Sequence, residues 1–477
     1  MIPLRRAYVD FSRTCQDWDG FGFNYVETCQ TRDYAAEPQD YGGFSIQKEE
    51  DRQAIVELTF GEDGLQPAIL KMFLDPFHQK EPAAGYRLND PLMDMTAYDH
   101  VTTTRWMRFF AREGARRARE RGEDFPVLVT LYGPPGWMTL QRFVRGRDLD
   151  PRLKMELGKY LLSWARYLRE AEGLNVRFAS LHNEGEDWQR WPLDGSAAGE
   201  AGHDYNLYWP PEQVTEYLRF LPAVARANGI PEVGIACGET SNWRRFDDWG
   251  YANALAADAE ALQNLALITS HGFYSPGQGR WNGDWRSAGI DKLRAARPEL
   301  RAWVTSTSWS KMDVLFVDEA RNSIYSAKVN AIIPWAGIQR SKLWTGGDPN
   351  PGTAFRVHED GTFSVEPGYY YYKQLTRAGR RGMKVAEAAC NDSERGIIAF
   401  ASAGTAHPDA FLVLNWSQEA PEPPLEVEVR GRRVRAFQAF RTSPREQYAP
   451  AGVWPVLKGR VACEAPPLSV TTFFAMA

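Results

Sequence analysis

Short apolar runs alternate with amphipathic stretches over most of the first 380 residues. Eight apolar runs are predicted to be strands: Gly20–Tyr25, Pro67–Leu74, Pro126–Tyr132, Val176–Leu181, Val233–Cys237, Leu265–Ser270, Ala302–Thr305 and Ala331–Trp335. Five stretches between them have helical spacing: Thr103–Arg121, Pro151–Glu172, Pro211–Asn228, Trp285–Ala296 and Val317–Lys328. Eight alternations of this length predict a (β/α)8 TIM barrel over residues 17–380, which places the chain in the α/β class.

The pattern changes after about residue 380, where short β-type runs follow one another without helical spacing. Glycine, proline and acidic residues separate these runs, which are Gly396–Phe400, Ala410–Leu414, Leu425–Val429, Val434–Phe440, Arg460–Cys463 and Ser469–Phe474. Closely spaced strands with turn residues between them are typical of an antiparallel β-sandwich. The sequence therefore predicts a second domain over residues 381–477.

Composition narrows the function classes. The chain of 477 residues carries 17 Trp, 20 Tyr and 24 Phe, and flat rings of this kind suit the apolar faces of sugars. A net charge of −5 gives no basic excess for binding nucleic acid. The five cysteines form no CxxC pair, so we expect neither a zinc site nor a disulfide framework. No apolar run is long enough for a membrane span and none follows the N-terminus as in a signal peptide, so a cytoplasmic location is expected.

Polar residues gather where the predicted strands end, which is the catalytic face of a barrel. The third strand is followed by Pro134-Pro135-Gly136-Trp137-Met138 and the fourth by His182-Asn183-Glu184. The sixth leads into His271-Gly272-Phe273-Tyr274, the seventh into Ser306-Thr307-Ser308-Trp309, and the eighth ends at Trp335.

This ordered set resembles the clan A glycoside hydrolases, most closely family 30. That family has a Pro-x-Trp-Met turn, an Asn-Glu pair, a His/Tyr pair and a Trp-x-Thr-Glu motif at these four strand ends. Here the last motif reads Trp303-Val304-Thr305-Ser306. The Gly20-Phe21-Gly22 turn and the tyrosine-rich segment Gly368–Lys373 also match. The resemblance implies that residues 1–16 add a strand to the C-terminal sandwich.

The resemblance implies a retaining β-glycosidase that acts on oligosaccharides or glycosides without a cofactor or metal. Glu184 would be the acid/base, and Asn183 would hydrogen-bond the sugar 2-hydroxyl. His271 and Tyr274 would orient the second carboxylate, while Trp137, Trp309 and Trp335 would line the pocket. Oligomeric state, sugar identity and linkage, and exo or endo action are not predicted.

Ser306 departs from the family pattern, because a glutamate nucleophile is expected there. A retaining enzyme needs two carboxyl groups about 5–5.5 Å apart, and a serine hydroxyl is too short and lacks a base. Three interpretations stay open. Ser306 is an engineered replacement that traps a substrate or permits glycosyl transfer, or it is natural and another carboxylate (Glu239, Glu186 or Asp187) takes the role. The third interpretation is that the alignment of the seventh strand is wrong, or that the protein is a catalytically silent sugar binder. An inverting enzyme using Glu184 and Glu239 is a further alternative.

A second departure lies beside the Asn-Glu pair. The family usually has Gln before the pair and Pro after it, where this chain has His182 and Gly185. The substrate subclass is therefore left open.

Overall fold

Eight parallel strands close into a barrel in the computed structural model, which describes residues 6–85, 87–186, 204–274, 283–340, 352–418 and 424–476. The barrel strands are β2 (Gly20–Asn24), β3 (Ile69–Leu74), β4 (Pro126–Leu131), β5 (Asn175–Ser180), β6 (Gly234–Thr240), β7 (Leu265–Ser270), β8 (Arg301–Thr307) and β9 (Ala331–Pro334). Each pairs in parallel with its neighbours, and β9 closes the ring on β2. The predicted fold class is confirmed.

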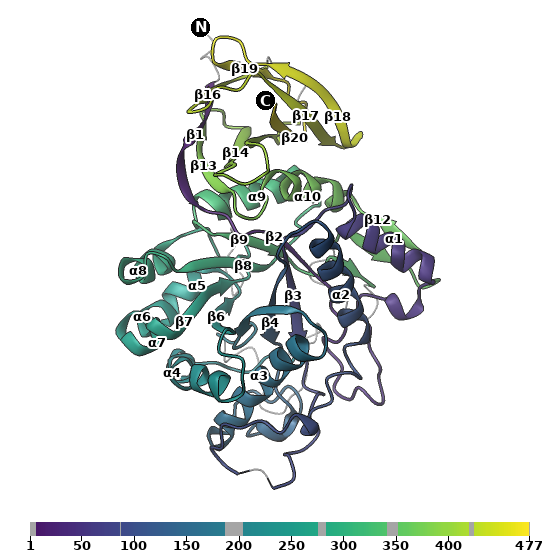
Figure 1. The fold of residues 1–477 in the computed structure, drawn as a ribbon, viewed down its shortest axis with the longest axis vertical. Coiled ribbons are helices and arrows are strands. Elements are labelled where there is room, and N and C mark those ends of the chain that lie inside the picture. The colour runs from purple at the N-terminus through teal and green to yellow at the C-terminus, as the bar shows by residue number, and fades with distance from the viewer. Residues whose placement is uncertain are drawn as a thin grey trace.

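Helices surround the barrel on its outer side (Figure 1). They are α1 (Glu49–Phe60), α2 (Arg105–Glu120), α3 (Lys154–Glu170), α4 (Pro211–Ala227), α5 (Trp243–Asp248), α6 (Tyr251–Ala257), α7 (Ala259–Asn264), α8 (Ala288–Ala296), α9 (Val314–Tyr325) and α10 (Pro367–Ala378). The five predicted helices are present with shifted ends. Helix α1 was not predicted; it begins with three acidic residues, Glu49, Glu50 and Asp51, and its buried residues all lie in its second half. Within the described residues, no helix is both long and apolar enough to cross a membrane.

Most barrel strands are buried on both faces, which explains their nearly continuous apolar sequence; β5 differs in that its Arg177 is exposed. An interior layer combines side chains from several strands: Ile69, Leu128, Ala236, Leu267, Trp303, Ala331 and Ile333. The opposite faces of the strands pack against the helices in a much larger apolar cluster. The interior is therefore filled by side chains, and the polar groups described below lie above this layer.

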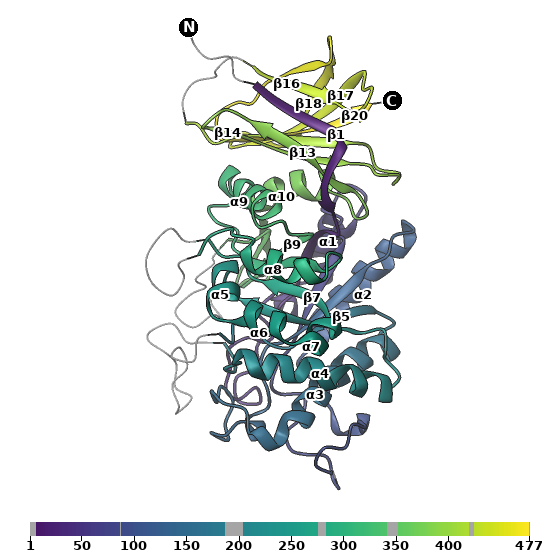
Figure 2. The same cartoon turned by 90° about the vertical axis from the view of Figure 1, so that its left-hand side faces the viewer.

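A nine-stranded sheet forms the second domain, in the order β18-β17-β20-β15-β14-β13-β1-β16-β19. Its strands are β1 (Arg6–Asp17), β13 (Lys384–Cys390), β14 (Arg395–Ala401), β15 (Ala410–Asn415), β16 (Leu425–Arg430), β17 (Ala436–Ser443), β18 (Glu446–Pro455), β19 (Arg460–Cys463) and β20 (Ser469–Met476). Strand β1 begins in this sheet, where it pairs parallel with β16 and antiparallel with β13, and leads from there toward the barrel (Figure 2). The remaining pairs are antiparallel.

The two domains share an apolar core. Phe400, Leu412, Leu414 and Val470 of the sheet belong to the same cluster as the barrel side chains. Helices α9 and α10 lie between the barrel and the sheet (Figure 1). A separate cluster that includes Phe411 and other side chains on the opposite face fills the sandwich itself. This continuous packing fixes the sheet against the side of the barrel that carries α9 and α10.

A third, small sheet follows the barrel. It consists of β10 (Ile338–Gln339), β11 (Phe355–Val357) and β12 (Phe363–Val365). Its parallel β10–β11 and antiparallel β11–β12 pairs connect the last barrel strand to α10.

Candidate active site

The ends of neighbouring barrel strands bring Glu184, Glu239 and His271 together. Glu184 follows β5 and His271 follows β7. Glu239 is the penultimate residue of β6. The backbone N–H of Glu184 donates to the carbonyl of Glu239 at 2.9 Å, which ties the two strand ends. All three residues are at most 5% exposed. The site is therefore a buried polar cluster at the C-terminal face of the barrel.

Local backbone strain positions both glutamates. Glu184 has φ +41° and Glu239 has φ +34°, a region that non-glycine residues rarely adopt. Gly238 has φ +120°, and a Cβ there would lie 1.9 Å from the carbonyl oxygen of Thr269. A register shift in the β6–β7 pairing begins at Cys237. This bulge turns the Glu239 side chain toward the barrel axis, and such strain is typical of functional sites.

A network of charged groups runs from Lys71 to Glu184. Lys71 Nζ donates to Glu239 Oε2 at 2.8 Å and to the Thr305 carbonyl at 3.1 Å, and both ionic side chains are fully buried. The Thr305 hydroxyl also donates to Glu239 Oε2, at 3.0 Å. His271 Nε2 lies 3.0 Å from the same oxygen, and His271 Nδ1 lies 2.9 Å from Glu184 Oε1. The imidazole of His271 therefore bridges the two carboxyl groups.

The charges of this network follow from its geometry. Burial would raise the pKa of Glu239, but Lys71 and His271 outweigh it and hold that pKa at about 2. Burial lowers the pKa of Lys71, and Glu239 opposes that change. Burial also lowers the pKa of His271, but its hydrogen bonds to Glu184 and Glu239 raise it above its ordinary value overall. Because ionised Glu239 can only accept, His271 Nε2 donates to it, and a proton lies between His271 Nδ1 and Glu184.

The remaining residues of the Asn-Glu segment have defined partners. Asn183 Nδ2 donates to Asn206 Oδ1 at 3.0 Å, which fixes the orientation of the amide. The ring of His182 stacks on Trp209 at 5.3 Å, and burial lowers the pKa of His182 to about 3. A Cβ at Gly185 would lie 2.8 Å from the Leu207 carbonyl oxygen, which explains why this position holds no proline.

Glu186 and Asp187 were candidates for the second carboxylate. Glu186 Oε1 accepts from the Ser241 amide at 2.8 Å and from the Ser241 hydroxyl at 2.6 Å. It also forms a buried ion pair with Arg245 at 3.3 Å. Glu186 therefore binds Ser241 and Arg245 at the start of α5. Asp187 lies outside the described residues.

Ser306 lies near the end of β8 and is 2% exposed. The pairing of β8 with β9 shifts register between Val304 and Thr307, the segment that contains this residue. The preceding Thr305 points its hydroxyl at Glu239, so β8 reaches the charged network. A role for Ser306 in catalysis stays a prediction.

The predicted aromatic lining is only partly accessible. Trp309 is fully buried, stacks on Phe316 at 5.2 Å and donates its indole N–H to the Trp335 carbonyl. This packing against α9 leaves no ring surface for a sugar, so the prediction that Trp309 lines the pocket is wrong. Trp335 packs edge-on against Phe73 at 5.7 Å and is 6% exposed.

Two aromatic candidates keep exposed surface. Trp137 is half-buried, and its indole N–H donates to the Gln79 carbonyl at 3.2 Å. Tyr274 is 41% exposed and stacks on Trp285 with ring centres 3.9 Å apart. Contact of Trp137, Trp335 and Tyr274 with a sugar stays a prediction.

Sequence reasoning missed Lys71 and Thr130. Lys71 is the one polar residue in Ile69–Leu74, a strand that is buried at every position. A lone lysine in such a strand is a signal for a buried carboxylate partner, because an unpaired buried ammonium is costly. The Thr130 hydroxyl, which lies 3.3 Å from Glu239 Oε1, follows no comparable pattern.

Several solved structures with the same fold are named as glycoside hydrolases. A family 30 endoxylanase from Clostridium papyrosolvens C71 superposes with a TM-score of 0.67 at 16% identity, covering 99% of this chain and 100% of its own. The catalytic domain of the family 30 xylanase C from Talaromyces cellulolyticus gives 0.70 at 17%, with coverage of 99% and 100%. The chain has a family 30-like, clan A glycoside hydrolase fold.

An endo-β1,6-glucanase matches this fold with a TM-score of 0.68 at 17% identity, covering 99% of this chain and 94% of its own. No protein-family model matches the sequence, and no curated protein matches it. The predicted resemblance is thus confirmed for the fold, which extends over barrel and sandwich together.

Proposed function

We propose that this protein binds β-glycosides at the barrel mouth through a glycosidase site in which Ser306 occupies the position of the nucleophile. The observation that carries the proposal is the Glu184–His271 pair at the ends of β5 and β7. It supplies a carboxyl group that shares a proton at the catalytic face of a glycosidase fold. Glu184 is the acid/base, and Asn183 contacts the sugar.

The missing carboxylate limits the reaction that this site performs. A retaining glycosidase attacks the anomeric carbon with one carboxylate while the other protonates the leaving oxygen. Glu184 can protonate that oxygen, but we do not expect Ser306 to form the glycosyl-enzyme intermediate, because a serine hydroxyl is shorter than a glutamate side chain and is a weak nucleophile on its own. We therefore expect the protein to bind ordinary glycosides and to hydrolyse them very slowly. A purely carbohydrate-binding protein is the second candidate, favoured by the same serine.

The geometry of Glu239 argues against the inverting alternative. An inverting pair needs a water molecule between two carboxyl groups. The imidazole of His271 lies between Glu184 and Glu239 and hydrogen-bonds both. Glu239 is also ion-paired with Lys71 and has no exposed surface, so it cannot reach a substrate. Its role is to position His271.

A glycosyl fluoride of inverted anomeric configuration would bypass the missing nucleophile. Glu184 would take the proton of an acceptor hydroxyl as that oxygen attacks the anomeric carbon. The carbon–fluorine bond breaks, fluoride leaves, and a new glycosidic bond forms with inversion. The released proton and fluoride balance the reaction, and the product then resists hydrolysis by the same protein.

Hydrolysis by a Ser306→Glu variant tests the proposal. Aryl β-glucosides, β-xylosides, β-galactosides and β-fucosides, together with xylan and β1,6-glucan, form the substrate panel, and Ser306→Gln is the matched control. We expect Ser306→Glu to raise hydrolysis of at least one substrate by orders of magnitude and Ser306→Gln to stay at background. If Ser306→Glu folds, binds a glycoside and remains inactive on all of them, the carbohydrate-binding alternative is favoured.

A further inference from the structure

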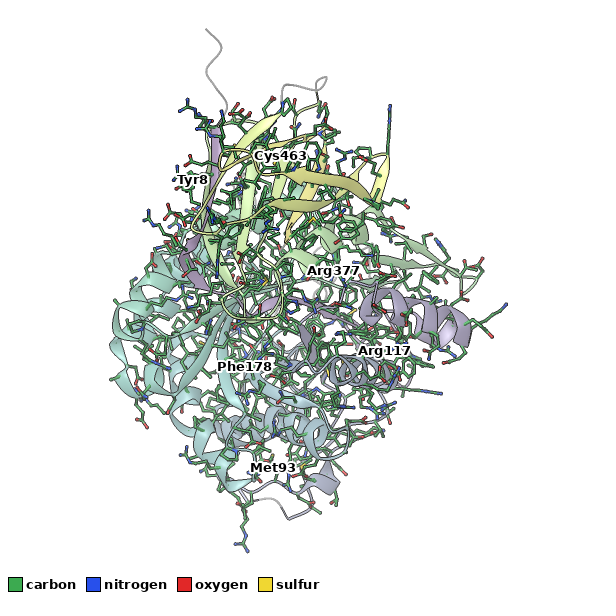
Figure 3. The ribbon with its side chains drawn as sticks, turned by 45° about the horizontal axis from the view of Figure 1, so that its top comes forward. Tyr8, Met93, Arg117, Phe178, Arg377 and Cys463 are labelled. Atoms are coloured by element: carbon green, nitrogen blue, oxygen red, sulfur yellow. The ribbon has the colours of Figure 1, made fainter. Side chains whose placement is uncertain are left out.

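A cavity of about 770 Å³ lies at the junction of barrel and sandwich, away from the Glu184 site. Gln66 and Glu123, which line it, precede β3 and β4 and so lie at the N-terminal ends of barrel strands. Glu184 lies at the opposite, C-terminal end. The other walls come from α10 and from strands β17, β18 and β20. Figure 3 shows Arg377 of α10 in this region between the two domains.

The cavity carries an excess of positive charge. Its cationic side chains are Arg121, Lys373, Arg377 and Arg380, whereas its carboxylates are Asp63 and Glu123. Glu123 is already engaged by Arg121 Nε at 2.9 Å and by an Arg380 amino group at 2.6 Å. Burial lowers the pKa of His407, which also lines the cavity, so this residue is neutral. The cavity therefore has four cationic side chains and two carboxylates, and one of these carboxylates, Glu123, is already paired with two of the arginines.

Two of these cations, Lys373 and Arg121, retain hydrogen-bonding capacity among the described residues. Within the described chain, Lys373 forms no ion pair, and its ammonium lies 4.7 Å from the ring centre of Tyr448. One terminal nitrogen of Arg121 is buried and has no hydrogen-bond partner among the described residues. Arg377 donates from one terminal nitrogen to the carbonyl of Glu62 at 2.9 Å. A buried donor without a partner is costly, so the Arg121 nitrogen, together with the Lys373 ammonium that has no ion pair among the described residues, favours an acceptor bound in this cavity.

One wall of the cavity is aromatic. Phe440 and Tyr448 stack with ring centres 5.0 Å apart and an interplanar angle of 9°, and Phe474 lies 6.0 Å from Phe440. A register shift between β17 and β18 next to Phe440, and φ +51° at Tyr448, interrupt the regular strand pairing here. All three rings are partly exposed. Flat rings beside cations suit a ligand that has both an apolar ring face and an anionic group.

We propose that this junction cavity binds a tetrahedral oxyanion of the phosphate or sulfate class, either free or esterified to a sugar. Guanidinium groups match the paired oxygens of such an anion, and an ammonium adds a point charge. The cavity is in the size range of small-molecule sites, so its volume can hold the anion together with an attached sugar. This site is independent of the chemistry at Glu184.

Calorimetric titration of the full-length protein with inorganic phosphate, glucose 6-phosphate and glucose tests the proposal. We expect binding of phosphate or glucose 6-phosphate and none of glucose. If glucose 6-phosphate binds more tightly than inorganic phosphate, the ligand is a phosphate ester of a sugar. If the two bind with equal affinity, the ligand is the free anion. Lys373→Gln and Arg377→Gln should each weaken binding by about tenfold, the order of one charge-assisted hydrogen bond.

The matched control is Arg116→Gln, which removes the same charge from an exposed position on α2 that does not line the cavity. It should leave binding unchanged. Lys373 forms no ion pair in the described chain, so its replacement is expected to fold, which thermal unfolding verifies. Absence of binding by both anions would overturn the proposal. Binding that Lys373→Gln and Arg377→Gln leave unchanged would also overturn it.

Discussion

Replacement of Lys71 by methionine should destabilise the protein strongly. Methionine has a similar length but no charge, so Lys71→Met leaves the Glu239 carboxylate fully buried without its cation. Glu239 would keep its contacts with His271, Thr130 and Thr305. Loss of one partner of a buried ion pair typically costs 3–5 kcal/mol, because the remaining charge is desolvated and unpaired.

The lowered pKa of Glu239 has the same physical origin, because Lys71 and His271 together outweigh the effect of burial. We therefore expect Lys71→Met to lower the free energy of unfolding by about 3 kcal/mol near neutral pH. The double variant Lys71→Met/Glu239→Gln removes both charges and should be more stable than Lys71→Met alone.

Urea denaturation followed by tryptophan fluorescence measures these free energies. Arg116→Gln serves as the control, because its ion pairs on α2 are exposed and contribute at most about 1 kcal/mol. A loss below about 1 kcal/mol in Lys71→Met would refute the reasoning. Strictly additive effects of Lys71→Met and Glu239→Gln would refute it as well, since coupled charges do not add.

Three further predictions concern the acid, the aromatic residues and pH. In the Ser306→Glu background, Glu184→Gln should abolish turnover of glycosides with poor leaving groups and affect aryl glycosides with good leaving groups much less, which steady-state kinetics measures; equal losses would contradict the acid role. Trp309→Ala should lower the free energy of unfolding by about 3–5 kcal/mol in denaturation because its ring is in the core, whereas Trp137→Ala should mainly weaken glycoside binding in titrations, by about 1–3 kcal/mol. The stabilisation from ionised Glu239 is complete above pH 4.5 and lost as pH falls toward about 2, so acid unfolding curves of Glu239→Gln should lack this component; identical curves for both proteins would contradict it.

Much of the barrel could be predicted, because most of its strands are buried apolar runs and five of the following helices have clear periodicity. Helix α1 escaped prediction because its first turn is acidic and only a few of its positions are buried. Strands β13 and β18 also escaped: β18 is largely exposed, so its sequence lacks the alternation of a half-buried strand. The parallel pairing of β1 with β16 depends on residues more than 400 positions apart, which no local pattern encodes.

For the site, sequence reasoning placed Glu184, Glu239 and His271 at strand ends but not their connections. The bridge through His271 depends on two strained glutamates and a bulge at Gly238, and those are products of the closed barrel. Trp309 was misassigned because a tryptophan after a strand can turn toward the pocket or toward the helices. Its contacts with Phe316 of α9 decide the direction, and only the tertiary structure contains them.

Residue 306 occupies, in our proposal, the position from which the nucleophile of a retaining glycosidase attacks, opposite Glu184. To test it, the Ser306→Glu variant is incubated with a 2-deoxy-2-fluoro glycoside that carries a good leaving group and is built on the sugar that the protein binds. The masses of the intact protein and of its peptides are then measured. Such a sugar slows breakdown of the covalent intermediate, so the account predicts one added glycosyl unit, located on the peptide that contains residue 306, and no addition to the parent protein. A glycosyl unit on Glu239 or Glu184, or a labelled parent protein, would contradict the account.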